Sequence, residues 1–173
     1  MVELVSPGRK LTAKIFFGLN TEVLWSPDSK AFAVSGSSEG ANGLYWTDVF
    51  LIEGERLVTI PLAPLIQRTF GHPVKCGWPE DPNVAAVTWT EASTRILLAA
   101  EIIHHSNCDS FGTFKAYEVH LPTKTVIKTY DQLETKKLFK PELGTELAGA
   151  PDNCVRNPKS CYVQANHPSL NKR

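Results

Sequence analysis

The chain has 173 residues, 42% of them hydrophobic, and its 18 basic residues balance its 18 acidic ones. This length suits one domain, so we expect residues 1–173 to form a single unit. A neutral chain lacks the electrostatic footprint of a general nucleic-acid binder, and we expect no nucleic-acid partner. No stretch approaches the roughly 20 apolar residues of a membrane span. The apolar run near the N-terminus is too short for a secretory signal.

The predicted elements begin with a lead-in over residues 1–20 that holds one strand, at 13–18. The first repeat occupies about residues 22–70, and the turn sequence SPDS separates its first two strands. Apolar residues then recur at helical spacing from Leu62 to Phe70 and predict a helix over 61–70. The predicted strands of this repeat span 22–25, 30–35, 45–53 and 56–60.

The second repeat occupies about residues 84–139 and follows the same plan. A helix is predicted over 132–139, with Asp131 as its N-cap and Glu134 in its first turn. Residues 144–173 are polar and rich in proline, asparagine and lysine, which is typical of an extended tail. The predicted strands of this repeat span 84–89, 95–103, 113–121 and 125–130.

The two repeats match each other, Trp25 with Trp89, Phe50 with Tyr117, and Phe70 with Phe139. We therefore predict a mainly β fold of two tandem antiparallel four-stranded meanders, each followed by a short α-helix. The meanders either pack on one another or continue as one larger sheet. Because Trp25, Trp89, Phe50 and Tyr117 recur at equivalent positions, we expect all four to be core residues rather than ligand contacts.

The segment WSPDS, Trp25 to Ser29, followed by an apolar strand and a second hairpin, resembles one blade of bacterial WD-repeat-like propellers. Those propellers occur in periplasmic and peptidase accessory domains. The second copy keeps Trp89 and Ser93 but lacks the proline and the aspartate. Only two blades are present, whereas a closed propeller needs at least about four. The chain as a whole also resembles a bacterial protein group that brings no activity with it.

The four cysteines indicate in which cellular compartment the protein occurs. An even number of them, with two in the polar tail, is typical of disulfides and an oxidising environment. We expect Cys154 to pair with Cys161, and Cys76 with Cys108 around the second repeat. An extracytoplasmic location, periplasmic or secreted, is favoured, and a cytoplasmic one stays open.

Two motifs suggest chemistry. Residues 36–40, GSSEG, match the G-x-S-x-G pattern of a nucleophile elbow at Ser38, but a second predicted strand rather than a helix follows them. The histidines and cysteines around the second repeat could bind zinc, although their spacing fits no strong zinc signature and a Cys76–Cys108 disulfide is the simpler reading. No cofactor motif is present, and we expect no cofactor. The weak metal-ligand candidates are His72, His104, His105 and Cys108, with Asp109 beside them.

Two long loops, 36–46 and 104–113, hold equivalent positions in the repeats and are candidates for a contact surface. We therefore favour a non-enzymatic protein- or ligand-binding module. A metal-dependent or hydrolytic enzyme that uses the 104–109 loop, and a structural repeat protein that self-associates, for instance as a homodimer, are the alternatives. The expected binding residues are Tyr45, Trp46, His104, His105 and Asp109.

Overall fold

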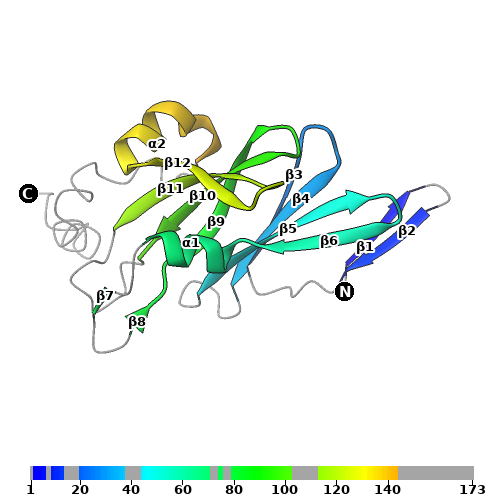
Figure 1. Cartoon of the computed structure of the whole chain (residues 1–173), viewed down its shortest axis with the longest axis horizontal. Helices are drawn as coiled ribbons and strands as arrows, with labels where there is room; N and C mark the ends of the chain where they lie inside the picture. The colour runs from blue at the N-terminus through cyan, green and yellow to red at the C-terminus, as the bar shows by residue number, and fades with distance from the viewer. Residues whose placement is uncertain are drawn as a thin grey trace, which may run out of the picture.

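The structure is a computed structural model, which describes residues 2–6, 9–13, 20–37, 44–70, 74–75, 79–102 and 113–143. Over these residues the protein is mainly β, with two four-stranded antiparallel sheets and a short α-helix after each (Figure 1). The predicted fold class is thereby confirmed. The predicted tail over 144–173 lies outside the described residues.

The first sheet is a meander with the strand order β3-β4-β5-β6, and α1 follows it. The predicted strand positions are confirmed because each strand combines β-prone apolar residues with turn residues at its ends. At the SPDS turn, Ser26 Oγ accepts from the Ala31 N–H at 2.9 Å and donates to Asp28 at 2.7 Å. The elements are β3 Asn20–Trp25, β4 Ala31–Ser37, β5 Tyr45–Glu53, β6 Arg56–Pro61 and α1 Ala63–Phe70.

The second sheet is a meander with the order β12-β11-β10-β9, and α2 follows it. Asp131 and Glu134 form a capping box at the start of α2, as the sequence predicts for the cap. The elements are β9 Asn83–Glu91, β10 Arg95–Glu101, β11 Phe114–His120, β12 Thr125–Tyr130, α2 Gln132–Phe139 and a 3-10 turn Lys140–Glu142.

Two small hairpins complete the described chain. β1 Val2–Ser6 pairs with β2 Arg9–Ala13, and β7 Val74–Lys75 pairs with β8 Pro79–Glu80. The β1–β2 hairpin contacts β6, at the end of the molecule opposite α2 (Figure 1). The lead-in therefore contains two strands earlier than the predicted one, of which only residue 13 is described.

The two sheets pack face against face and do not continue as one sheet. We call the side of the first sheet that carries Trp25, Phe32 and Phe50 its front face, and the side that carries Ala33 and Val49 its back face. The equivalent front face of the second sheet, which includes Trp89 and Ile96, joins the back face of the first in one core. Equivalent faces thus stack front to back, in the manner of successive repeats rather than of a two-fold pair.

Cross-strand register refines the match between the repeats. Trp25 pairs with Phe32 and Phe32 with Phe50, while Trp89 pairs with Ile96 and Ile96 with Val119. Phe50 is therefore equivalent to Val119, two residues beyond the match predicted from sequence, and Tyr117 is equivalent to Asp48. Length differences in the loops and register shifts in the second sheet, in the β9–β10 and β11–β12 pairs, together account for the drift between the repeats.

The prediction that all four recurring aromatic residues are core residues is wrong for one of them. Trp89, Phe50 and Tyr117 are 9%, 1% and 1% exposed, but Trp25 is 45% exposed. The physical reason is the stacking direction. The front face of the second sheet packs against the first sheet and buries Trp89, whereas the burial of Phe32 and Phe50 on the front face of the first sheet does not extend to Trp25 on the edge strand β3.

The back face of the second sheet is closed by α2 instead of by another sheet. Tyr130 meets the Phe139 ring edge-on at a centroid distance of 5.4 Å, within a cluster that includes Leu97, Phe114 and Ala116. Two of the residues that α2 buries are polar, Gln132 and Thr135. The helix thus covers this sheet with these two polar residues and Phe139, and leaves Leu133 and Leu138 exposed.

Candidate functional site

A chain of hydroxyl groups joins the two sheets beside the hydrophobic core. Ser35 and Thr47 face each other across β4 and β5, with their hydroxyl oxygens 2.9 Å apart. Ser35 Oγ accepts from the Ala86 N–H at 2.9 Å, and Thr47 Oγ1 donates to the Val84 carbonyl at 2.8 Å. Two side chains of the first sheet therefore bind the backbone of β9 directly, and they fix where the second sheet sits.

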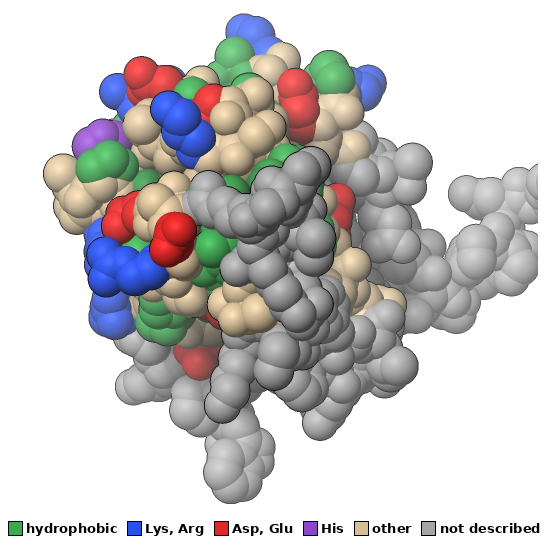
Figure 2. Space-filling view, turned by 90° about the vertical axis from the view of Figure 1, so that its right-hand side faces the viewer, with side chains coloured by type: hydrophobic (Ala, Val, Ile, Leu, Met, Phe, Trp, Pro, Cys, Tyr) green, Lys and Arg blue, Asp and Glu red, His purple; other side chains and the backbone are tan. Residues whose placement is uncertain are grey.

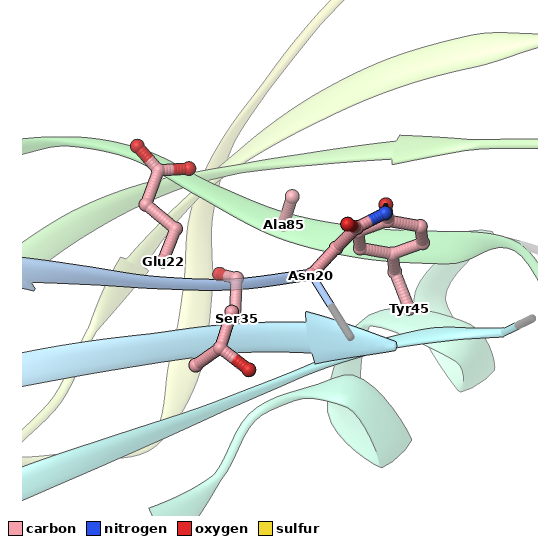
Figure 3. A pocket seen from close by; sticks show the side chains of 6 residues that line it. Asn20, Glu22, Ser35, Tyr45 and Ala85 are labelled. Atoms are coloured by element: carbon pink, nitrogen blue, oxygen red, sulfur yellow. Dashed lines mark hydrogen bonds between the residues drawn. The ribbon is translucent and has the colours of Figure 1, made fainter. Parts of the chain in front are cut away.

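A pocket of about 280 Å³ opens next to this hydroxyl chain and is lined by residues of β3, β4, β5 and β9. Figure 3 shows the pocket between the two sheets, with Glu22 on one side, Asn20 and Tyr45 together on the other, and Ala85 of β9 across from them. The lining residues are Asn20, Thr21, Glu22, Ser35, Tyr45 and Ala85.

Hydrogen bonds hold one wall of the pocket in place. Asn20 Nδ2 donates to the Tyr45 hydroxyl at 3.0 Å, and the Tyr45 backbone N–H donates to Asn83 Oδ1 at 2.9 Å. Asn20 and Asn83 are the first residues of β3 and β9 and occupy equivalent positions in the two repeats. Tyr45 is thus fixed by an asparagine from each repeat, which orients both its ring and its hydroxyl.

The pocket offers mainly hydrogen-bond acceptors to a ligand. Among the described residues that line it, the exposed Glu22 carboxylate is the one charged group, and the Asn20 amide oxygen stays available after the amide nitrogen has bonded Tyr45. The Tyr45 hydroxyl can still donate, since it accepts the Asn20 bond. Such a lining suits a ligand that carries N–H or O–H groups and a positive charge, and it disfavours an anion.

The structure places two of the five predicted binding residues. Tyr45 lines the pocket. Trp46 lies on the front face and packs over Gly36, its cross-strand partner; a Cβ atom added to Gly36 would come within 3.1 Å of the Trp46 ring. An aromatic ring packed over a cross-strand glycine stabilises a strand pair. His104, His105 and Asp109 lie outside the described residues, as do His72, Ser38 and all four cysteines. Their predicted roles stay predictions.

Sequence reasoning missed Asn20, Glu22 and Ser35. Glu22 and Ser35 sit inside predicted strands, and Asn20 lies just before one, at positions that alternation turns toward the second sheet; polar residues at core-facing positions were the available signal. Tyr45 was identified because it is an aromatic residue beside a glycine-containing loop. The sequence does not predict which faces of the two sheets pack together, so the hydrogen-bond partners of Tyr45 could not be predicted either.

A second unusual polar group lies on the front face of the first sheet. The half-buried Asp48 aligns with Val34, and Val34 aligns with Val23, in one cross-strand row. Burial raises the pKa of the Asp48 carboxyl above its ordinary value of 3.8. The folded protein therefore takes up a proton at Asp48 at a higher pH than the unfolded chain does.

Asp48→Asn is expected to stabilise the fold at pH 7 by about 0.5 kcal/mol, a small effect because the side chain is only partly buried. With a raised folded-state pKa, the stability that Asp48 contributes falls as the pH rises from 3.8 through that pKa. The gain should vanish below pH 3.8, where both states are protonated. Urea unfolding at pH 7 and pH 3 measures this gain in stability, and Asp81→Asn, at an exposed aspartate, is the control. An equal gain at both pH values would contradict the prediction.

No protein family, curated protein or solved structure is significantly similar to the chain. In the part of the chain that the structure describes, no helix is long and apolar enough to cross a membrane. The same described residues contain no cluster of three or more His, Cys, Asp or Glu side chains that could hold a metal ion. On the face shown in Figure 2, acidic, basic and hydrophobic side chains are interspersed where coloured atoms are visible.

Proposed function

We propose that the chain is a non-enzymatic binding module of a bacterial extracytoplasmic space, built from two propeller-blade-like repeats, and that it binds its ligand in the pocket between β3 and β9. The pocket carries the proposal, because it lies at the junction of the repeats and its wall is fixed by an asparagine from each. Pockets between repeats or domains with a few convergent polar groups are the usual place for a ligand.

The ligand chemistry that fits is a small cation with several N–H donors, such as an alkylammonium or a guanidinium group. Glu22 supplies the opposite charge, Asn20 an amide oxygen, and the Tyr45 ring an aromatic face for a cation. Either a free small molecule or a lysine or arginine side chain of a peptide could present this group.

Argininamide is the probe for this proposal. It should shift the amide resonances of Asn20, Glu22 and Tyr45 in a ¹H–¹⁵N NMR titration, whereas citrate and glucose should not. Glu22→Gln should weaken the binding by about tenfold, since a hydrogen bond to a charged group contributes about 1.5–3 kcal/mol. Glu53→Gln, which changes an exposed carboxylate outside the pocket, should leave it unchanged. Equal affinity in the two variants, or no shift with argininamide, would rule the pocket out.

The compartment is proposed on the cysteines alone and has its own test. We expect no free thiol in denatured, unreduced protein purified from its native host, because all four cysteines would form disulfides. Four free thiols would place the protein in a reducing compartment. They would also restore the 104–109 loop as a metal-site candidate, which metal analysis of the purified protein could then decide.

A further inference from the structure

The strand β3 forms an edge of the first sheet and also borders the ligand pocket. It carries three of the six lining residues, Asn20, Thr21 and Glu22, and no described strand pairs with its outer side. Four of its six residues are exposed, among them Val23 and Trp25 at 46% and 45%. An edge strand presents backbone N–H and C=O groups with which another strand can pair.

The hydrogen bonds between β3 and β4 show which backbone groups of β3 point outward. Ser26, which directly follows β3, donates its N–H to the Ala31 carbonyl at 2.9 Å. In an antiparallel pair, such hydrogen-bonded residues alternate with residues whose N–H and C=O groups point away from the neighbouring strand. Trp25 and Val23, one and three residues before Ser26, therefore direct these groups to the outer side of β3.

The other three edges of the two sheets are protected in ways that β3 lacks. The β1–β2 hairpin contacts β6, which ends in Pro61, and Ser35 and Thr47 bind the backbone of β9. β12 carries Lys128 and has a register shift in its pairing with β11. Covering elements, proline, lysine and irregular register are the means by which natural sheets block edge pairing. β3 pairs with β4 in continuous register and contains neither lysine nor proline.

The side chains of a strand added to β3 would alternate between two different surroundings. On the pocket side they would lie beside Glu22, where a lysine or arginine places its charge against the carboxylate. On the other side they would lie beside Val23 and Trp25, where an apolar side chain covers hydrophobic surface. Glu22 is the one charged residue of β3, so a second copy of β3 would bring another carboxylate instead of a cation. Charge complementarity therefore favours a basic partner.

We propose that the partner is an extended peptide segment that pairs with β3 as a fifth strand of the first sheet, with a lysine or arginine side chain in the pocket and an apolar residue on either side of it in sequence. This rests on the proposed function and names the source of the cationic group, which is a peptide rather than a free small molecule. In such strand addition the main-chain hydrogen bonds give affinity and the alternating side chains give specificity.

The probe is the pentapeptide acetyl-Thr-Val-Arg-Val-Thr-amide, and argininamide is its reference. In an NMR titration the peptide should bind the wild type about tenfold more tightly than argininamide does, because hydrogen bonds to the β3 backbone add to the contact with Glu22. Val23→Pro removes an outward N–H, and proline is tolerated on an edge strand at such a position. This variant should bind argininamide like the wild type and the peptide no more tightly than argininamide.

Val23→Thr is the matched control, because it keeps both the N–H and the shape of the side chain, and it should retain the full gain in affinity. Circular dichroism shows that both variants are folded. Two versions of the peptide, N-methylated at alternate residues, test the pairing on the wild type itself. Since only every second N–H of a strand faces its neighbour, one version should lose the gain and the other should keep it.

The outcomes separate the peptide from the pocket. A peptide that binds no more tightly than argininamide, or two methylated versions of equal affinity, would overturn the strand pairing and leave the pocket proposal standing. Failure of argininamide to bind would remove both. A wild type that dimerises in sedimentation velocity, with the dimer lost in Val23→Pro, would assign this edge to a second copy of the chain and would also overturn the proposal.

Discussion

Trp89→Ala is expected to cost about 3–5 kcal/mol of folding stability, the range for removing a buried aromatic side chain. Trp89 is buried in the core between the sheets, and its indole N–H bonds the Leu24 carbonyl. Its loss opens a cavity between the two repeats and removes a hydrogen bond that joins them. For a domain whose total stability is typically about 5–15 kcal/mol, such a loss brings the protein close to unfolding at ambient temperature.

Trp25→Ala is the matched control, since the same substitution is made at the equivalent position of the other repeat. Trp25 rests on Phe32 at a centroid distance of 5.0 Å but is half exposed, so we expect a loss of about 1 kcal/mol. Urea unfolding of both variants at low protein concentration, where copies stay apart, measures the difference. Equal losses at the two positions would contradict the front-to-back stacking of the sheets.

These two tryptophans show which features of the structure can be predicted from the sequence and which cannot. Strand positions, both helices and the Asp131 cap follow from local chemistry, namely alternation, turn residues and helical spacing. Burial does not follow from the repeat alone. Two equivalent residues share a face of their sheets, but Trp89 is buried because its face packs against the first sheet, whereas Trp25 lies half exposed on the edge strand β3.

The cross-strand register is a second feature that the sequence alone does not predict. Sequence similarity favours matching Phe50 with Tyr117, because both are aromatic, but backbone pairing matches Phe50 with Val119. Both matches put the residue on the same face, since they differ by two positions. The error therefore leaves the fold class intact, yet it hides the equivalence of Asp48 with Tyr117, and so the presence of a half-buried carboxylate on the front face of the first sheet.

Thr47→Val should destabilise the protein by about 2–3 kcal/mol although the two side chains have nearly the same shape. Thr47 is fully buried, and its hydroxyl group lies between Ser35 and the Val84 carbonyl of β9. Valine removes the donor to that carbonyl and the acceptor for the Ser35 O–H, so the buried Ser35 hydroxyl keeps only the bond that it accepts from the Ala86 N–H. The hydroxyl chain that positions the second sheet would be broken at its middle.

Thr59→Val provides the control, because Thr59 is exposed on β6 and the same substitution there should change stability by less than about 0.5 kcal/mol. Chemical denaturation measures both variants, and amide exchange of Ala86, which Ser35 binds, reports the junction itself. Faster exchange there in Thr47→Val, with strands β10 and β11 still protected, would show local opening between the sheets. Unchanged stability in Thr47→Val would mean that apolar packing alone positions the sheets, and the equivalent positions of the second sheet, Ala99 and Ala116, would then differ from Ser35 and Thr47 without consequence.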